Sequence, residues 1–87
     1  MPYDLYILYS QKIDRYYIGI SSNAEKRLFS HNNFPKGWTA KGIPWILVYK
    51  KSFENKKEAQ YWENFIKRQK KRSLVEKIIS GKFNFIK

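Results

Sequence analysis

Two side chains suited to phosphate and proton-transfer chemistry lie four residues apart near residue 27. Arg27 and His31 share one face if this segment is helical, with Lys26 beside them. An arginine guanidinium grips a phosphate through two hydrogen bonds, and its charge does not titrate away. His31, the only histidine of the chain, can transfer a proton or bind phosphate near neutral pH. The same spacing is common on solvated helix faces, so the pattern alone leaves both interpretations open.

Two tyrosines lie eleven residues apart, each within a short aromatic segment: Tyr6 and Tyr17. A tyrosine hydroxyl can position a water molecule, and it can accept a proton when a nearby cation lowers its pKa. Tyrosines in strands are more often ordinary packing residues, which is the alternative for both positions.

Glu63 is a candidate metal ligand at the edge of an apolar helical arc. Its carboxylate could hold a magnesium ion that also binds substrate phosphate and water, because Mg²⁺ often uses only one or two protein carboxylates. Lys67 follows four residues later, so an ion pair explains the spacing equally well. The chain has no cysteine, which excludes disulfides, thiolate metal sites and cysteine nucleophiles.

The chain carries 18 Lys and Arg against 7 Asp and Glu, a formal net charge of +11. This excess indicates a polyanionic partner, and nucleic acid is the leading candidate because neutralised phosphates release counterions. We expect phosphate contacts from basic residues of three segments: Lys26, Lys36, Lys41, Lys67, Arg68, Lys70, Lys71 and Arg72. A solvated helix end is the alternative for the last five.

Length and composition predict one domain over residues 1–87. The longest apolar run, residues 45–49, is too short to cross a bilayer, and the start lacks the features of a signal peptide. We therefore expect a cytoplasmic protein with no membrane partner and no small-molecule cofactor.

Three short aliphatic and aromatic runs predict strands at residues 5–9, 16–20 and 45–49. The polar stretch between the first two runs favours a hairpin. Gly19, inside the second run, indicates close approach by another backbone or a ligand. Residues 34–42 contain Pro35, Gly37 and Gly42 and predict a basic loop.

Three capping boxes predict the starts of helices, at residues 22–25, 55–58 and 73–76. The first helix should end near residue 31, before Pro35, the second near Gln69, and the third at Gly81. In the second helix an apolar arc predicts core positions at Ala59, Tyr61, Trp62, Phe65 and Ile66. The order β-β-α-β-α-α predicts an α/β domain with a small antiparallel or mixed sheet.

Taken together, these residues resemble the GIY-YIG nuclease superfamily. The likeness rests on residues 5–10, on Tyr-Ile-Gly at 17–19 followed by Ser21, and on Arg27, His31 and Glu63. It extends from Tyr3 to about Leu74 and is greatest to the small excinuclease-C-like, UPF0213-like members. The resemblance implies a three-stranded antiparallel sheet flanked by helices.

The resemblance also implies a metal-dependent endonuclease that hydrolyses DNA phosphodiester bonds in repair or recombination. The family's two tyrosines fall on Tyr6 and Tyr17, its arginine on Arg27 and its histidine on His31. Its metal ligand falls on Glu63, which would bind Mg²⁺ or Mn²⁺. In this scheme Tyr17 or Tyr6 activates water, and the arginine offsets charge on the phosphate. The histidine assists proton transfer or positioning.

The chain departs from the family pattern before the first tyrosine, where Asp4 and Leu5 replace Gly and Ile. No later asparagine can be assigned to the site, since Asn84 lies near the end. We expect no appended DNA-recognition domain, and therefore slight sequence specificity or targeting by a partner protein. Two alternatives stay open: a non-catalytic nucleic-acid-binding module with this fold, and an adapter for a larger complex. Duplex, branched and RNA substrates also stay open.

Overall fold

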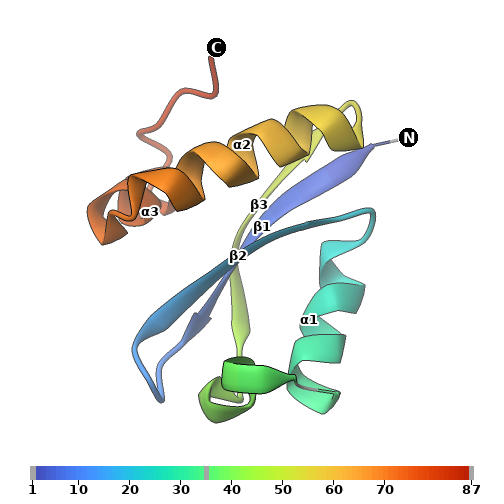
Figure 1. The fold of residues 1–87 in the computed structure, drawn as a ribbon, viewed down its shortest axis with the longest axis vertical. Helices are drawn as coiled ribbons and strands as arrows, with labels where there is room; N and C mark the ends of the chain where they lie inside the picture. The colour runs from blue at the N-terminus through green and yellow to red at the C-terminus, as the bar shows by residue number, and fades with distance from the viewer. Residues whose placement is uncertain (1, 35, 87) are drawn as a thin grey trace.

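The computed structural model describes residues 2–34 and 36–86. The elements in chain order are β1 (Tyr3–Ser10), β2 (Arg15–Ser21), α1 (Ala24–Asn33), the 3-10 helix η1 (Gly37–Gly42), β3 (Ile46–Phe53), α2 (Lys56–Gln69) and α3 (Arg72–Ile79). The expected order β-β-α-β-α-α is confirmed (Figure 1). The loop expected over residues 34–42 is a correction, because most of it forms η1. The expected stop at Pro35 lies outside the described residues.

The sheet has the strand order β2-β1-β3, and both pairings are antiparallel. The antiparallel alternative is therefore confirmed and the mixed sheet is wrong. All three strands extend beyond their apolar runs, and β3 continues through Lys50 and Lys51 to Phe53. Hydrogen bonding to the neighbouring strand maintains these polar ends as strand, although their composition alone does not predict it.

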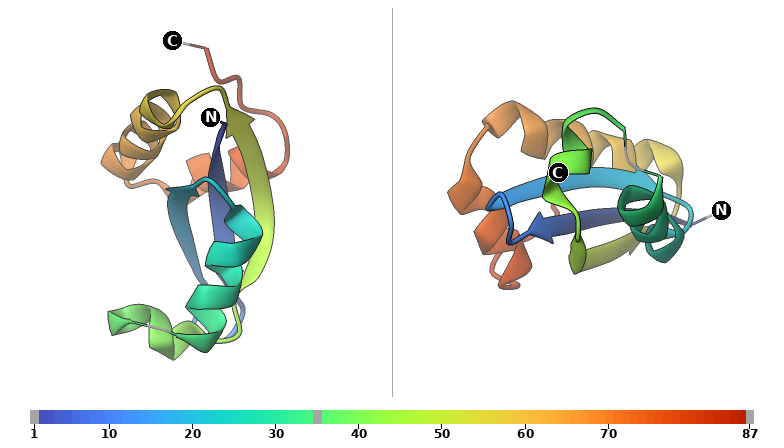
Figure 2. Two further views of the ribbon diagram at one scale, coloured as in Figure 1. Left: turned by 90° about the vertical axis from the view of Figure 1, so that its right-hand side faces the viewer. Right: turned by 90° about the horizontal axis from the view of Figure 1, so that it is seen from below.

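Alternate residues of β1 face two separate hydrophobic clusters on the two sides of the sheet. Leu5 and Ile7 pack with buried residues of α2 and α3, including Trp62. Tyr6 and Leu8 pack on the other side with Ala24 of α1, Trp45 and their neighbours. Figure 2 shows the resulting layers, with α1 and the α2–α3 pair separated by the sheet. Tyr6 therefore belongs to the face that α1 covers.

The helix starts differ from the expected capping boxes in two of three cases. Asn23 rather than Ser22 caps α1, because its side chain accepts the Lys26 amide at 3.0 Å. Asn55 caps α2 as expected and accepts the Glu58 amide at 2.9 Å. No side chain caps α3, and Ser73 lies inside its first turn.

The expected apolar arc of α2 is confirmed in its centre. Ala59, Trp62 and Ile66 are buried, and Phe65 packs partly buried against them. Tyr61 is a correction: it is 41% exposed, since its side chain lies at the solvent edge of the arc. None of the described helices is long and apolar enough to cross a membrane.

Candidate active site

Gly19 makes room for the Tyr6 side chain. The two residues are directly opposite in the β1–β2 register, and Tyr6 is only 1% exposed. A Cβ on Gly19 would lie 2.5 Å from the Tyr6 hydroxyl oxygen, so no other residue fits without displacing the ring. The close approach expected at Gly19 is therefore made by a side chain, rather than by a backbone or a ligand.

Two of the other residues expected to carry chemistry contact the Tyr6 side chain. His31 Nε2 lies 3.5 Å from its hydroxyl, and the Tyr17 ring stacks at a centroid distance of 6.3 Å. Arg27 lowers the pKa of this hydroxyl, and the charge of Glu63, on α2, has the smallest effect on it. Thus β1, β2 and α1 bring Tyr6, Tyr17 and His31 together, whereas Glu63 lies on α2.

Burial raises the pKa of Tyr6, although the hydrogen bond from Arg27 opposes this effect. A tyrosine whose pKa is raised above its ordinary value of 10.0 stays protonated at neutral pH. Its hydroxyl is thus a neutral hydrogen-bond partner of His31 rather than a base. Tyr6 is also too deeply buried to meet a substrate directly.

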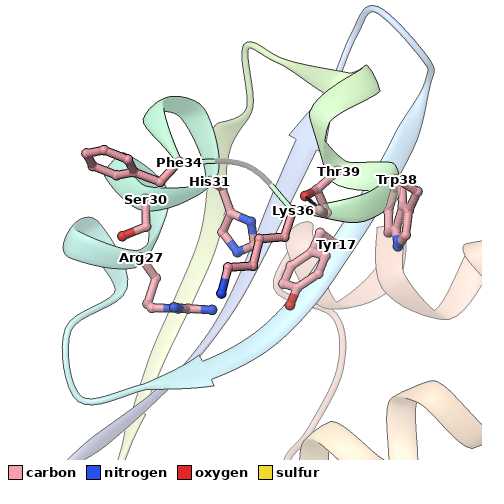
Figure 3. A pocket seen from close by; sticks show the side chains of 8 residues that line it. All are labelled: Tyr17, Arg27, Ser30, His31, Phe34, Lys36, Trp38 and Thr39. Carbon is pink, nitrogen blue, oxygen red and sulfur yellow. Dashed lines mark hydrogen bonds between the residues drawn. The ribbon is translucent and has the colours of Figure 1, made fainter.

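A pocket of about 510 Å³ opens above this cluster, between α1 and η1. Its lining residues are Tyr17, Arg27, Ser30, His31, Phe34, Lys36, Trp38 and Thr39. Figure 3 shows Arg27 at one end and Trp38 at the other, with Lys36 and Tyr17 between them. Two cations and no carboxylate line the pocket, so it suits an anionic group such as a phosphate. We call it the cleavage pocket below, after the activity that the resemblance implies.

Polar contacts anchor α1 to the sheet. The buried Asp4 carboxylate accepts from the Ala24 amide at 3.4 Å and from the Ser52 hydroxyl at 2.5 Å. At the other end of α1, Asn32 pairs with both backbone groups of Trp45, at 2.6 and 2.9 Å. These contacts hold the helix that carries Arg27 and His31 in one position. Asp4, which departs from the family pattern, thus has a structural role in anchoring α1.

The cleavage pocket contains residues that the sequence patterns did not single out. Thr39 is buried, and its carbonyl accepts from the Trp45 indole at 2.9 Å, which fixes η1 against the sheet. Trp38, next to it, is 50% exposed. An aromatic residue in a basic segment rich in glycine was the available signal for Trp38.

Glu63 forms the ion pair that its spacing allowed. Its side chain is 12% exposed, and it accepts from Lys67 Nζ at 3.0 Å and from Gln60 Nε2 at 2.6 Å. The described residues include no group of three or more His, Cys, Asp or Glu that could hold a metal ion. One carboxylate fits a Mg²⁺ ion completed by water and substrate phosphate, and it does not fit a closed zinc site.

The expected phosphate contacts separate into several groups. Lys36 lines the cleavage pocket, and Lys41 lines the neighbouring one together with Trp38. Four others line a pocket near the α2–α3 junction: Lys67, Lys70, Lys71 and Arg72. Lys26 and Arg68 are exposed and line none of these pockets.

Arg72 is held by internal contacts. It binds the Asp14 carboxylate at 2.6 Å and Glu76 at 3.4 Å, and its guanidinium lies 5.0 Å from the centre of the Tyr16 ring. These contacts raise the pKa of Arg72, the hydrogen bond with Asp14 most. Because its charge is already compensated, we expect Arg72 to bind a phosphate more weakly than the neighbouring lysines do.

The pKa of His31, the single histidine, reports on the electrostatics of the site. Burial lowers the pKa of His31 below its ordinary value of 6.5, and the charge of Arg27 lowers it further. We expect a pH titration of the His31 imidazole by NMR to give a pKa below 6.5, so that the ring is neutral at pH 7. Arg27→Gln should move this pKa upward, because it removes the second cause.

The same shift makes stability depend on pH in one direction. The unfolded chain binds a proton at His31 more readily than the folded protein does, so folding stability falls as pH drops from 6.5 through the folded pKa. Lys57→Ala, which removes one exposed charge at the start of α2, is the control and should leave the titration unchanged. A His31 pKa at or above 6.5 would contradict the buried position of the ring.

Comparison with known proteins gives concordant results. The family model described as the GIY-YIG catalytic domain matches residues 2–78. A UPF0213 protein of Clostridium perfringens (strain 13 / Type A) is 39% identical over 70 residues, which cover 79% of this chain and 75% of that protein. The solution NMR structure of a UPF0213 protein from Bacillus halodurans is similar with a TM-score of 0.60 at 28% identity, covering 94% of this chain and 86% of that one. The range matched by the family model contains Tyr6, Tyr17, Arg27, His31 and Glu63.

Proposed function

Because the chain belongs to the GIY-YIG family, whose members are nucleases, we propose that it is a metal-dependent endonuclease that hydrolyses DNA phosphodiester bonds. The observation that supports this most strongly is that Tyr17 and His31 contact the buried Tyr6 side chain and line one pocket together with Arg27. Binding of nucleic acid without cleavage requires cations, but it does not require a histidine in contact with two tyrosines. The activity is of the kind that DNA repair and recombination require.

Arg27 and Lys36 bind the scissile phosphate in the cleavage pocket. Arg27 presents a planar fork of donors, and the contacts that anchor α1 to the sheet position this residue before the substrate arrives. A donor fixed in advance stabilises the charge that develops on the phosphate in the transition state. Lys36 adds charge without such a fixed direction.

Tyr17 and His31 prepare the attacking water. Tyr17 lines the pocket, and its ring lies 4.4 Å from the His31 ring between centroids. The Tyr17 hydroxyl positions the water, and the neutral imidazole accepts the proton that the water releases. Tyr6 holds His31 by accepting a hydrogen bond from its Nε2–H, so that the lone pair of Nδ1 receives the proton of the water. Tyr17 is then the tyrosine that meets the substrate.

Glu63 is the residue that would hold the divalent cation, Mg²⁺ or Mn²⁺. When bound, such an ion polarises the phosphate and stabilises the leaving oxygen. Glu63 is the one carboxylate among the groups that act on the Tyr6 hydroxyl. In the absence of a cation, its charge is compensated by Lys67.

The test is a cleavage assay on supercoiled plasmid and on branched and flapped duplexes, with Mg²⁺ or Mn²⁺ against EDTA. We expect cutting that depends on the metal and falls about 10²-fold in Tyr17→Phe, because the water loses the group that positions it. Tyr49→Phe is the matched control, since Tyr49 lies on β3 and packs with the cluster on the other side of the sheet. Tight, salt-sensitive binding with no cutting in any metal would overturn the proposal in favour of a binding module.

A further inference from the structure

Three pockets follow one another around the end of the molecule that carries η1 and the β1–β2 hairpin. The cleavage pocket shares Trp38 with a neighbouring pocket of about 460 Å³, lined by Ile13, Arg15, Trp38 and Lys41. That pocket in turn shares Arg15 with another of about 460 Å³ near the α2–α3 junction. Figure 1 shows η1 and the hairpin at the same end, and Arg72 at the start of α3 binds Asp14 of the hairpin at 2.6 Å.

We call the path through these pockets beyond the cleavage pocket the basic track. Arg15, Lys41, Lys70 and Lys71 line it, and among the described residues none of these four forms an ion pair. Asp14 is the single carboxylate among the lining residues of these pockets, and Arg72 already compensates it at 2.6 Å. The track is therefore strongly cationic, which suits successive phosphates of a nucleic-acid backbone.

Trp38 stands where the track leaves the cleavage pocket. It is 50% exposed, whereas the other two tryptophans, Trp45 and Trp62, are 2% and 3% exposed. Its ring packs edge-on against Trp45 at 5.7 Å, so buried neighbours hold it in place. An exposed indole next to a cationic groove is the arrangement on which unpaired bases stack.

The track also passes from one face of the sheet to the other. Tyr17 of the edge strand β2 lines the cleavage pocket, while Tyr16 and Ile18, which point to the opposite face, line the last pocket. A nucleic-acid strand that occupies both pockets must therefore bend sharply around β2. Duplex DNA has a persistence length of about 150 bp and resists such a bend, whereas a single strand follows it easily.

We propose that the basic track holds an unpaired nucleic-acid strand that leaves the cleavage pocket, with a base stacked on Trp38 and phosphates on Arg15, Lys41, Lys70 and Lys71. This inference rests on the proposed function and assigns it a substrate class, nucleic acid with an unpaired strand beside the cut. In a duplex, adjacent base pairs already cover both faces of each base, so the Trp38 indole cannot stack on it.

Tryptophan fluorescence tests the stacking directly, because Trp38 is the one of the three tryptophans that a base can reach. In EDTA, where no cutting is expected, oligothymidylate of about twelve nucleotides should quench the emission. A blunt hairpin duplex with the same number of phosphates should quench it far less. Trp38→Leu should abolish the quenching and weaken oligothymidylate binding about 10-fold, whereas Trp38→Phe should retain most of the affinity.

Charge-matched double variants test the track. Lys70→Ala with Lys71→Ala should lower the salt dependence of oligothymidylate binding by roughly 1.4 in the log–log slope. Lys57→Ala with Lys77→Ala removes the same charge from α2 and α3 at exposed positions outside the track, and should change the slope little. Equal slopes for the two double variants, or equal quenching by the duplex, would overturn the inference.

The two proposals fail in distinguishable ways. A protein that is quenched by oligothymidylate but cuts nothing in any metal contradicts the nuclease proposal alone. A protein that cuts flapped DNA with Mg²⁺, yet shows no quenching and no effect of Trp38→Leu, contradicts the track alone.

Discussion

Arg27→Ala is expected to lower kcat for DNA cleavage about 10²–10³-fold, while DNA affinity falls only several-fold. The guanidinium lines the pocket on a helix anchored to the sheet, so we expect it to stabilise charge that appears only in the transition state. Affinity persists because 17 other Lys and Arg residues remain, as the total of 18 implies. Single-turnover cleavage rates, measured beside filter binding in EDTA, separate the two effects.

Two further variants bracket this result. Arg27→Lys retains the charge but loses the planar fork, so its rate should lie between those of wild type and Arg27→Ala. Lys57→Ala removes one exposed charge outside the cleavage pocket and should cut at the wild-type rate. A loss of affinity in proportion to the loss of rate would make Arg27 a phosphate anchor without a role in the chemical step.

The strands and helices were predictable because local patterns determine them. The three apolar runs place the sheet, and Asn55 marks the start of α2. The start of α3 was not predictable in the same way. Arg72 in its first turn binds Asp14, 58 residues away in the chain, and no local pattern contains that contact. Only the fold brings the hairpin and the α2–α3 junction together.

The residue types of the candidate site were predictable, whereas their different environments were not. Tyr6 and Tyr17 are equivalent in the sequence, since both lie in aromatic strands. The fold buries Tyr6 opposite Gly19 and leaves Tyr17 in the wall of the pocket. Burial then separates their roles, because a buried phenol keeps its proton. His31 was expected either to react or to face solvent, and its burial follows from the packing of α1 on the sheet.

Glu63→Gln is expected to have the largest effect on cleavage, a loss of about 10³-fold with Mg²⁺ at its working concentration. A bound cation contributes several kcal/mol to transition-state stabilisation, and each 1.36 kcal/mol is a factor of ten in rate. Glutamine has nearly the same shape but no charge, so it retains an acceptor for Gln60 while binding a divalent cation poorly. The Mg²⁺ titration of the cleavage rate should therefore shift to much higher concentration.

The fold should survive this substitution. The ion pair with Lys67 is an i,i+4 pair on a helix with the lysine half exposed, and such pairs contribute only about 0.3–0.5 kcal/mol. Glu54→Gln, at an exposed position in the connection between β3 and α2, removes the same charge and should leave the Mg²⁺ titration unchanged. If Glu63→Gln lowers the melting temperature by more than about ten degrees, the carboxylate is a structural partner of Gln60 and Lys67. An unchanged Mg²⁺ titration in a folded Glu63→Gln protein would move the cation to another carboxylate.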